Sequence, residues 1–318
     1  MQVDAASADY YRSLPGQLGD RLRQVLRIED GESFMTIQDG RCPMWRSDGL
    51  CRIQAELGEA ALCQTCREFP RLTHDYGDFV EMGLELSCPE AARLILAAEY
   101  QPMAEDTLPG GEAPDYDADA MAALKKSREK MRVLLSHAHR PIGETLALGL
   151  LYGVQAQSEL DGAEPSPFDP EEALQTAREL AQSGDIGEIP QFFTQLELLT
   201  REWAIRLRQP SPAPWESGHL ALARYLVDRY WLQAVSDYDL YSRVKLVVIA
   251  CLLVKTLGGD LIRTAQLFSK EIENDADNVD ALLDAAYTHP AFTDAKLLYH
   301  LLAGCTPQIP TAGTNRAE

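Results

Sequence analysis

Five cysteines lie close together in the first third of the sequence and carry its clearest chemical signal. They follow the pattern Cys42-x8-Cys51-x11-Cys63-x2-Cys66-x21-Cys88. Thiolates are soft ligands, and several within reach of one another can bind zinc or an iron–sulfur cluster. The two residues between Cys63 and Cys66 allow both sulfurs to face one ion. We therefore predict that these five side chains are the ligands of one inorganic centre.

The spacing of the cysteines does not determine which metal or cluster binds. The paired knuckles of a zinc ribbon are missing, and His74 is the only imidazole in this part of the sequence. Five loosely spaced thiols favour an iron–sulfur cluster, with zinc as the alternative. A competing interpretation is that some of the cysteines are small buried apolar residues, as free cysteines often are.

The other nucleophilic and aromatic side chains give no comparable signal. The sequence contains no Gly-x-Gly-x-x-Gly fingerprint and no P-loop. His137 and His139 are two residues apart on a predicted helix and therefore point to different faces. Tryptophan and tyrosine are frequent over residues 203–241, which we interpret as packing between long helices.

Composition sets the class of protein that must position the cysteines. Of the 318 residues, 46% are hydrophobic and 25% are charged, as in a soluble globular protein. The longest apolar run, residues 246–254, is about half a membrane span and is predicted to be a buried helix. With no signal peptide recognised, we expect a cytoplasmic protein, in which thiols stay reduced and bind metal rather than form disulfides.

The net charge of −20 limits the classes of partner that the protein is expected to bind. Nucleic-acid binding requires a basic surface that displaces counterions, so nucleic acid is not expected as a partner, and neither is a membrane. The charge is compatible with a lysine-bearing protein partner, although an acidic surface also serves solubility alone.

The expected fold is mainly α: a helical domain with a small irregular cysteine-rich module that binds a metal or cluster and carries one or two short strands. We place an N-terminal helix and this module in residues 1–100, a linker in 101–118, the helical domain in 119–305 and a disordered tail in 306–318. Short strands are predicted near residues 34–38 and 80–86. Helices are predicted at residues 7–28, from Pro170 onward, and at 189–208, 220–235, 238–257, 261–272, 279–287 and 295–302.

Each cysteine stands among characteristic neighbours. These are DGRCP at residues 39–43, DGLCRIQ at 48–54, LCQTCREFPR at 62–71 and LSCPEAAR at 86–93. This run, roughly residues 36–96, resembles the flagellin lysine-N-methylase family. A weaker similarity extends to residues 268–273 and 282–285.

The resemblance implies transfer of methyl groups from S-adenosyl-L-methionine to lysine side chains of flagellin, with a cysteine-bound iron–sulfur cluster of the [4Fe–4S] type. It also implies that Cys42, Cys51, Cys66 and Cys88 are ligands, with Cys63 a less regular member. It identifies neither the catalytic residues nor the S-adenosylmethionine site. Members of this family usually begin with a further segment, Cys-x-Gly-x2-Cys-x2-Thr-Cys-Cys, whereas this sequence has no cysteine before Cys42. The sequence is therefore interpreted either as shortened at its start or as a natural variant with fewer ligands.

Two further hypotheses compete with a methyltransferase. The first is a non-enzymatic metal- or iron–sulfur-binding scaffold or interaction protein, favoured by the missing nucleotide fingerprint. The second is an electron-transfer protein, which requires a reversible redox couple.

Overall fold

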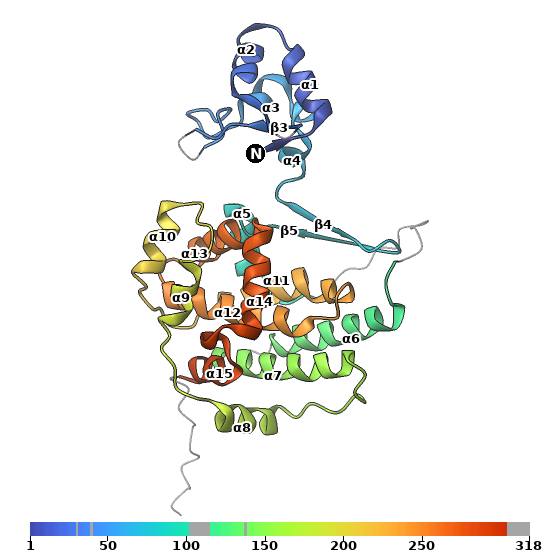
Figure 1. The fold of residues 1–318 in the computed structure, drawn as a ribbon, viewed down its shortest axis with the longest axis vertical. Coiled ribbons are helices and arrows are strands. Elements are labelled where there is room, and N and C mark those ends of the chain that lie inside the picture. Colours follow the sequence, from blue (N-terminus) through green and yellow to red (C-terminus); the bar gives the residue numbers. More distant parts are fainter. Residues whose placement is uncertain (30, 39–40, 102–114, 137–138, 304–318) are drawn as a thin grey trace, which may run out of the picture. The chain divides into compact units, whose positions relative to one another are not determined.

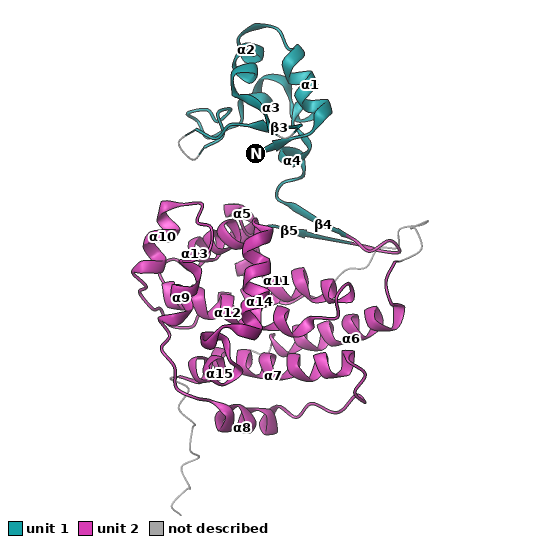
Figure 2. Ribbon diagram, in the orientation of Figure 1, with its two compact units in different colours: residues 1–74, 81–85 teal, residues 75–80, 86–318 magenta. Residues whose placement is uncertain are grey.

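The computed structural model describes residues 1–29, 31–38, 41–101, 115–136 and 139–303 (Figure 1). The prediction of a mainly α protein is confirmed. The chain forms two compact units, residues 1–74 with 81–85 and residues 75–80 with 86–318 (Figure 2). Most of the predicted linker, the predicted tail and His137 lie outside the described residues.

This division differs from the predicted boundary at residue 100. Helix α5 (Pro89–Ala97) belongs to the second unit because it packs against α11 (Ser217–Tyr230) and α13 (Leu261–Phe268). The cysteine region is therefore divided, and Cys88 belongs to the second unit rather than the first.

Unit 1 begins with two helices and three short strands. They are β1 (Gln2–Val3), α1 (Ala5–Ser13), α2 (Gly16–Val25), β2 (Leu26–Glu29) and β3 (Glu32–Met35). Strand β3 pairs antiparallel with both β1 and β2, so that Phe34 lies opposite Gln2 on one side and Arg27 on the other. The structure thus contains more strands than the one or two that were predicted.

The single helix predicted over residues 7–28 is wrong. Leu14 and Pro15 both have extended backbone, which ends α1 and begins α2, and the last residues of the predicted helix form β2 instead. Proline lacks the N–H that would continue a helix, so the break falls where the chain offers no intrahelical donor.

The rest of unit 1 consists of short elements. They are α3 (Arg52–Leu57), the 3-10 turn η1 (Glu59–Ala61), α4 (Gln64–Glu68) and the hairpin of β4 (Arg71–Asp75) and β5 (Val80–Leu84). Strand β5 confirms the strand predicted near residues 80–86, although Met82 is 72% exposed. The tip of the hairpin, residues 75–80, belongs to unit 2.

Unit 2 is a helical domain (Figure 1). Besides α5, α11 and α13 it contains α6 (Ala118–Leu134), α7 (Ile142–Leu160), α8 (Pro170–Leu180), α9 (Glu188–Phe193), α10 (Arg201–Arg208), α12 (Leu240–Leu257), α14 (Ala276–Thr288) and α15 (Asp294–Leu302), with the shorter turns η2 (Trp231–Val235), η3 (Ser269–Glu273) and η4 (Pro290–Phe292). Helix α12 is the centre of this unit: all but two of its 18 residues are buried, and it packs against α7, α11 and α14. The apolar run at residues 246–254 is therefore a buried helix, as predicted, and no helix in the described part of the chain is long and apolar enough to cross a membrane.

Two predicted helix ends are confirmed in detail. The Asp169 carboxylate accepts hydrogen bonds from the backbone N–H groups of Glu171 and Glu172, and so caps α8. Helix α12 ends at Gly258, whose φ of 61° is the left-handed conformation that glycine adopts readily.

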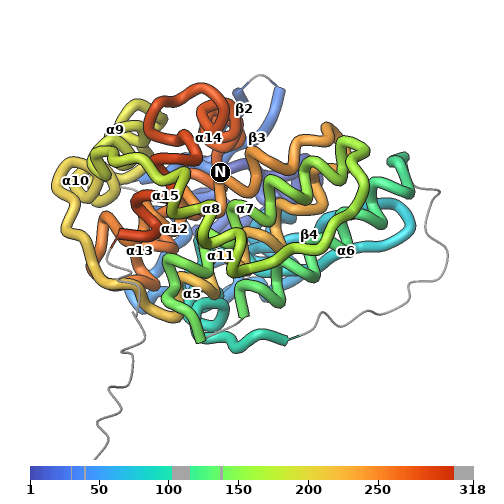
Figure 3. The backbone as a smooth tube through the Cα atoms, turned by 90° about the horizontal axis from the view of Figure 1, so that it is seen from below, coloured from blue at the N-terminus to red at the C-terminus, as the bar shows by residue number. Residues whose placement is uncertain are grey.

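The single helix predicted over residues 189–208 is wrong, because α9 and α10 are separate (Figure 3). Side chains from η3 and α14 satisfy backbone donors in the break. The N–H of Leu199 donates to Glu271 Oε2 at 2.7 Å, and the N–H of Glu197 donates to Asn278 Oδ1 at 3.2 Å. These tertiary bonds outweigh the local helical pattern, and a sequence pattern cannot show them.

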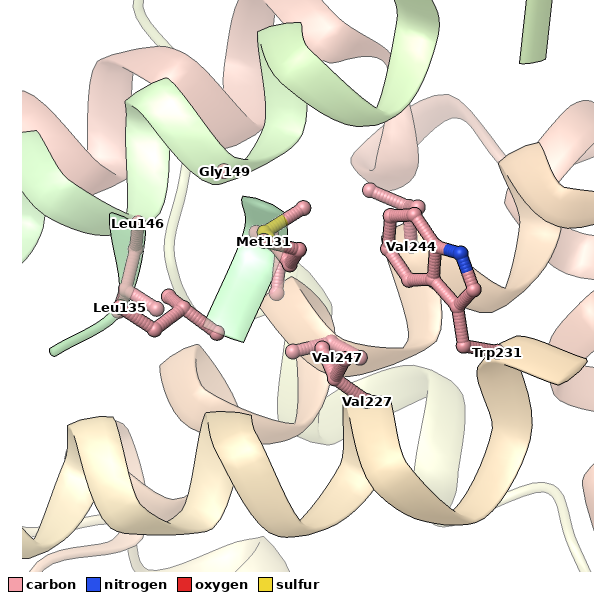
Figure 4. A pocket seen from close by; sticks show the side chains of 9 residues that line it. Met131, Leu135, Leu146, Gly149, Val227, Trp231, Val244 and Val247 are labelled. Atoms are coloured by element: carbon pink, nitrogen blue, oxygen red, sulfur yellow. The ribbon is translucent and has the colours of Figure 1, made fainter. Parts of the chain in front are cut away.

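Several aromatic residues of the stretch 203–241 lie in the core, as predicted, but Tyr238 is 43% exposed. Trp203 and Trp231 are almost completely buried, and Tyr225 and Tyr230 are also buried. Trp231 borders a small gap of about 10 Å³ together with Met131 and Val244 (Figure 4). The gap is walled by apolar side chains and offers no polar partner to a water molecule, so it is a packing defect rather than a ligand site.

Candidate functional site

Four of the five predicted ligands lie in unit 1. The Cys63 side chain is 1% exposed and belongs to the core of the unit. Cys42, Cys51 and Cys66 are half-buried and pack against that same core. The fold thus brings to one small core four thiols that lie within 25 consecutive residues, Cys42 to Cys66.

A compact loop holds Cys42 and Cys51. The N–H of Trp45 donates to the carbonyl of Cys42 at 3.0 Å, and Trp45 forms an isolated antiparallel bridge with Cys51. Arg21 of α2 fixes this loop to the helices, because its Nε and Nη2 donate to the carbonyl of Pro43 at 3.1 and 2.8 Å. Cys51 is then the N-cap residue of α3.

The Cys63–Cys66 pair lies at the start of α4, where Cys63 is the N-cap residue. One carboxylate joins this helix to α1. Asp4 accepts from the N–H of Ser7 at 2.9 Å and from the N–H of Gln64 at 2.9 Å, so that it serves the first turns of two helices. The same hydrogen bonds, that from Gln64 first, lower the pKa of Asp4.

The thiols influence one another electrostatically. A hydrogen bond between the side chains lowers the pKa of Cys63 and raises that of Cys66, because the Cys66 thiol donates to the Cys63 sulfur. Burial raises the pKa of Cys42, and the charges of Cys51 and Cys63 add to that effect. Four thiols within electrostatic reach of one another are the donor set that soft metals prefer.

Tyr11 of α1 is the polar neighbour of this set. Its side chain is fully buried, and its hydroxyl donates to the carbonyl of Ala61 at 2.7 Å. Burial raises the pKa of Tyr11, and the charge of Cys63 raises it further. The tyrosine therefore stays protonated and anchors the turn that precedes Cys63.

The sulfurs are nevertheless not arranged as a formed metal site. Across the described ranges, no group of three or more Cys, His, Asp or Glu side chains is placed so that it could hold a metal ion. Two of the sulfurs lie beside methionine sulfurs: Cys42 Sγ lies 3.7 Å from Met35 Sδ, and Cys66 Sγ lies 3.7 Å from Met1 Sδ. The donor chemistry fits a metal or cluster but the positions do not, so the shared centre stays a prediction.

Cys88 occupies a different setting in unit 2. It is the N-cap residue of α5, with Pro89 at the first helical position. The backbone just before it is fixed by side chains of the helical domain: Gln266 Nε2 donates to the carbonyl of Ser87 at 2.9 Å, and the N–H of Leu86 donates to the Tyr225 hydroxyl at 3.4 Å. Cys88 therefore belongs to a different compact unit from the other four cysteines, and its place in a shared centre stays a prediction.

A buried polar network supports the segment that leads to Cys88. The Tyr225 hydroxyl donates to Glu273 Oε2 at 3.3 Å and accepts from Arg229 Nη1 at 2.9 Å. Arg229 Nε lies 3.3 Å from Glu273 Oε1, and the Glu273 side chain is 1% exposed. Burial raises the pKa of Glu273, and the charge of Arg229 opposes that shift. The pair is enclosed and its two charges lie close enough to offset each other, so it acts as structural support for residues 86–88.

The sequence did not predict this network of Tyr225, Arg229 and Glu273. Glu273 ends the π-helical turn η3, and π-helical turns occur often at functional sites. The available signal was the weaker family similarity at residues 268–273, which includes Glu273. Nothing in the sequence pairs that carboxylate with Arg229, because the two residues are 44 positions apart.

Comparisons with known proteins find similarity over part of the chain. Over 66 residues, 21% of this chain, it is 47% identical to the protein named Lysine-N-methylase from Salmonella typhimurium strain LT2, and equally to its namesake from Salmonella choleraesuis strain SC-B67. The Flagellar biosynthetic protein FliU of Salmonella muenchen gives the same identity over the same length. The predicted resemblance is confirmed over these 66 residues.

The similarity is partial in both directions. The matched stretch spans 39% of FliU and 16% of each lysine-N-methylase, far less than two thirds of any of them. No protein-family profile matches the chain, and no solved structure matches it. The comparisons therefore support the family for one stretch of the sequence.

Proposed function

We propose that this protein transfers methyl groups from S-adenosylmethionine to lysine side chains of flagellin. The observation that carries the proposal is the 47% identity over 66 residues to proteins named Lysine-N-methylase. The relative named Flagellar biosynthetic protein FliU supports flagellin as the substrate. Because the match covers a small part of each relative, the activity, the methyl donor and the substrate all belong to the proposal.

The reaction has simple chemical requirements. A neutral lysine amine attacks the sulfonium methyl carbon in line with the breaking carbon–sulfur bond, and S-adenosylhomocysteine leaves. The ammonium form of the lysine must lose a proton first, because it has no lone pair to attack with. The transfer moves no net electrons from the protein, so it does not require a redox centre.

In this proposal the cysteines have a structural role. Cys42, Cys51, Cys63 and Cys66 would hold a [4Fe–4S] cluster, with zinc as the alternative. A bound metal would join the 42–51 loop to α3 and α4 and would contribute folding energy to unit 1. No step of the methyl transfer passes through it.

The test is incubation of the full chain, loaded with iron or with zinc, with flagellin and methyl-labelled S-adenosylmethionine. We expect label on flagellin lysines, located by mass spectrometry, and no label on flagellin whose lysines have been acetylated chemically beforehand. Unlabelled flagellin from metal-loaded protein that does bind S-adenosylmethionine would contradict flagellin as the substrate. Absence of S-adenosylmethionine binding would contradict the methyltransferase itself.

One observation favours the alternative of a metal-binding interaction protein. Trp45 and Leu50, on the loop between Cys42 and Cys51, are 52% and 60% exposed. Large exposed apolar side chains suit contact with a partner protein. Under this alternative the protein would bind metal and retain flagellin on an affinity resin, but would transfer no methyl group.

A further inference from the structure

A cavity in unit 2 is lined by positively charged side chains, although the chain as a whole is acidic. It has a volume of about 570 Å³ and lies at the start of α7. Its two charged walls are Arg140 and Lys255, and the remaining walls include Ile142, Pro214 and Trp215. No acidic side chain of the described residues lines it, although the whole chain carries a net charge of −20.

The two cations of the cavity are poorly neutralised. In the part of the chain that the structure describes, Lys255 has no carboxylate partner, and its Nζ lies 5.3 Å from the centre of the Trp215 ring. Arg140 pairs at 2.5 Å with Glu171, whose side chain is 75% exposed. Such a solvent-exposed pair contributes little, so Arg140 can exchange this partner for a ligand at low cost.

The other polar groups at the cavity are hydrogen-bond donors. Trp215 Nε1 is buried, and no residue of the described ranges accepts its hydrogen bond. Among the described residues, no side chain caps the 19-residue helix α7, so the N–H groups of its first turn have no side-chain acceptor there. Gly143 allows the start of α7 to lie close to Leu301 and Trp215. A Cβ at this position would lie 2.0 Å from the carbonyl oxygen of Leu301 and 3.3 Å from Trp215 Nε1.

We propose that this cavity binds the phosphate or carboxylate group of a small organic anion, whose apolar part lies against Ile142, Pro214 and Trp215. Arg140, Lys255, the Trp215 N–H and the first turn of α7 all favour negative charge and offer it donors. The doubly charged phosphate satisfies two cations better than a carboxylate does. S-adenosylmethionine carries a net positive charge and is the wrong ligand for these walls, so this inference goes beyond the proposed function and does not depend on it.

The test is a titration of the full chain with inorganic phosphate, followed by nitrogen-15 NMR of the tryptophan side chains. The protein contains four tryptophans, so the indole N–H region is simple, and Trp215→Phe assigns the signal. We expect that signal to shift with a Kd of about 1 mM or tighter. Lys255→Met should weaken binding about tenfold, which corresponds to about 1.4 kcal/mol.

Matched controls separate the possible outcomes. Lys126→Met removes the same charge from an exposed position on α6 outside the cavity, and should leave phosphate binding unchanged. Acetate tests whether a carboxylate alone suffices. The proposal is overturned if the Trp215 signal does not move at about 20 mM phosphate, or if Lys255→Met binds phosphate as the unmodified chain does. Displacement of the signal by S-adenosylmethionine but not by phosphate would overturn the ligand class and leave the proposed methyl transfer standing.

Discussion

The two units of this protein contrast in how much apolar surface they bury. Among the described residues, the core of unit 1 consists of eleven buried apolar residues, one of which is Cys63, and that of unit 2 consists of 54. Small units bury a smaller fraction of their surface and often need a further source of stability. The cysteines of unit 1 lie in and beside its core, where such a source would act.

The units also differ in their polar anchors. In unit 1 the anchors link short segments of backbone: Asp4 serves two helix starts, and Arg21 holds the 42–51 loop. In unit 2 a charged pair, Arg229 and Glu273, is enclosed within the helical domain. The first kind of anchor organises a unit with little core, and the second depends on a large core that surrounds it.

The largest expected effect distinguishes the units by metal dependence. Removal of metal with a chelator, or Cys42→Ala, should unfold unit 1, since structural metal contributes on the order of 10 kcal/mol to small domains. Hydrogen exchange measured by mass spectrometry should show loss of protection in residues 1–74 and retained protection in α12. Cys251→Ala is the control, because Cys251 is buried in α12 and belongs to unit 2. Equal protection of unit 1 with and without metal would refute its structural role.

A second prediction concerns the large core of unit 2. Trp203 is fully buried, and Trp203→Ala should lower the free energy of unfolding by about 3–5 kcal/mol through lost burial and a cavity. Trp45→Ala, at an exposed position in unit 1, should change it by about 1 kcal/mol or less. Chemical denaturation monitored by circular dichroism measures both. Similar losses of unfolding free energy in the two variants would contradict the predicted difference between the two cores.

A third prediction isolates the enclosed charged pair. Glu273→Gln leaves the Arg229 guanidinium without its counter-charge and should cost about 3 kcal/mol of stability. Glu90→Gln, which removes an exposed partner of Arg93, should leave the stability nearly unchanged. A thermal unfolding series of the two variants compares them. If Glu273→Gln is as mild as Glu90→Gln, the pair is not supporting residues 86–88.

The smallest effect belongs to the helix anchor of unit 1. Asp4→Ala removes the acceptor of two backbone N–H groups and should cost about 1 kcal/mol. The pKa of Asp4 is lowered from its ordinary 3.8, so its contribution is complete above that value and disappears as the pH falls through the lower, folded pKa. Unfolding measured between neutral pH and about pH 2 should therefore show the two proteins converging in acid. A difference that persists or grows at low pH would contradict this role.

Local sequence signals predicted much of this fold. Apolar periodicity identified α12, an aspartate and a proline identified the start of α8, and alternation identified β5. The failures occurred where distant side chains decide the backbone conformation. The break between α9 and α10 depends on Glu271 and Asn278, more than seventy residues away.

The candidate site shows the same limit. The sequence pattern identified all five cysteines, and the fold gathers four of them because the elements between Cys42 and Cys66 are short and share one core. The sequence pattern did not indicate that α5 packs on the helical domain, so that Cys88 belongs to unit 2. Nor did the sequence pattern indicate the cavity of Arg140 and Lys255, whose walls come from residues far apart in the sequence.

Three of the five cysteines share one position: Cys51, Cys63 and Cys88 precede the first residues of α3, α4 and α5, and none of the three sulfurs caps its helix. Serine, the usual conservative replacement for cysteine, is among the best residues at that position because its hydroxyl oxygen accepts from the free N–H groups. A serine variant at these sites would therefore strengthen a helix start while it removes a sulfur, and the two effects would partly cancel in any stability measurement. Alanine replacements, set beside serine replacements at the same three sites, would separate the value of each sulfur from the value of a better cap.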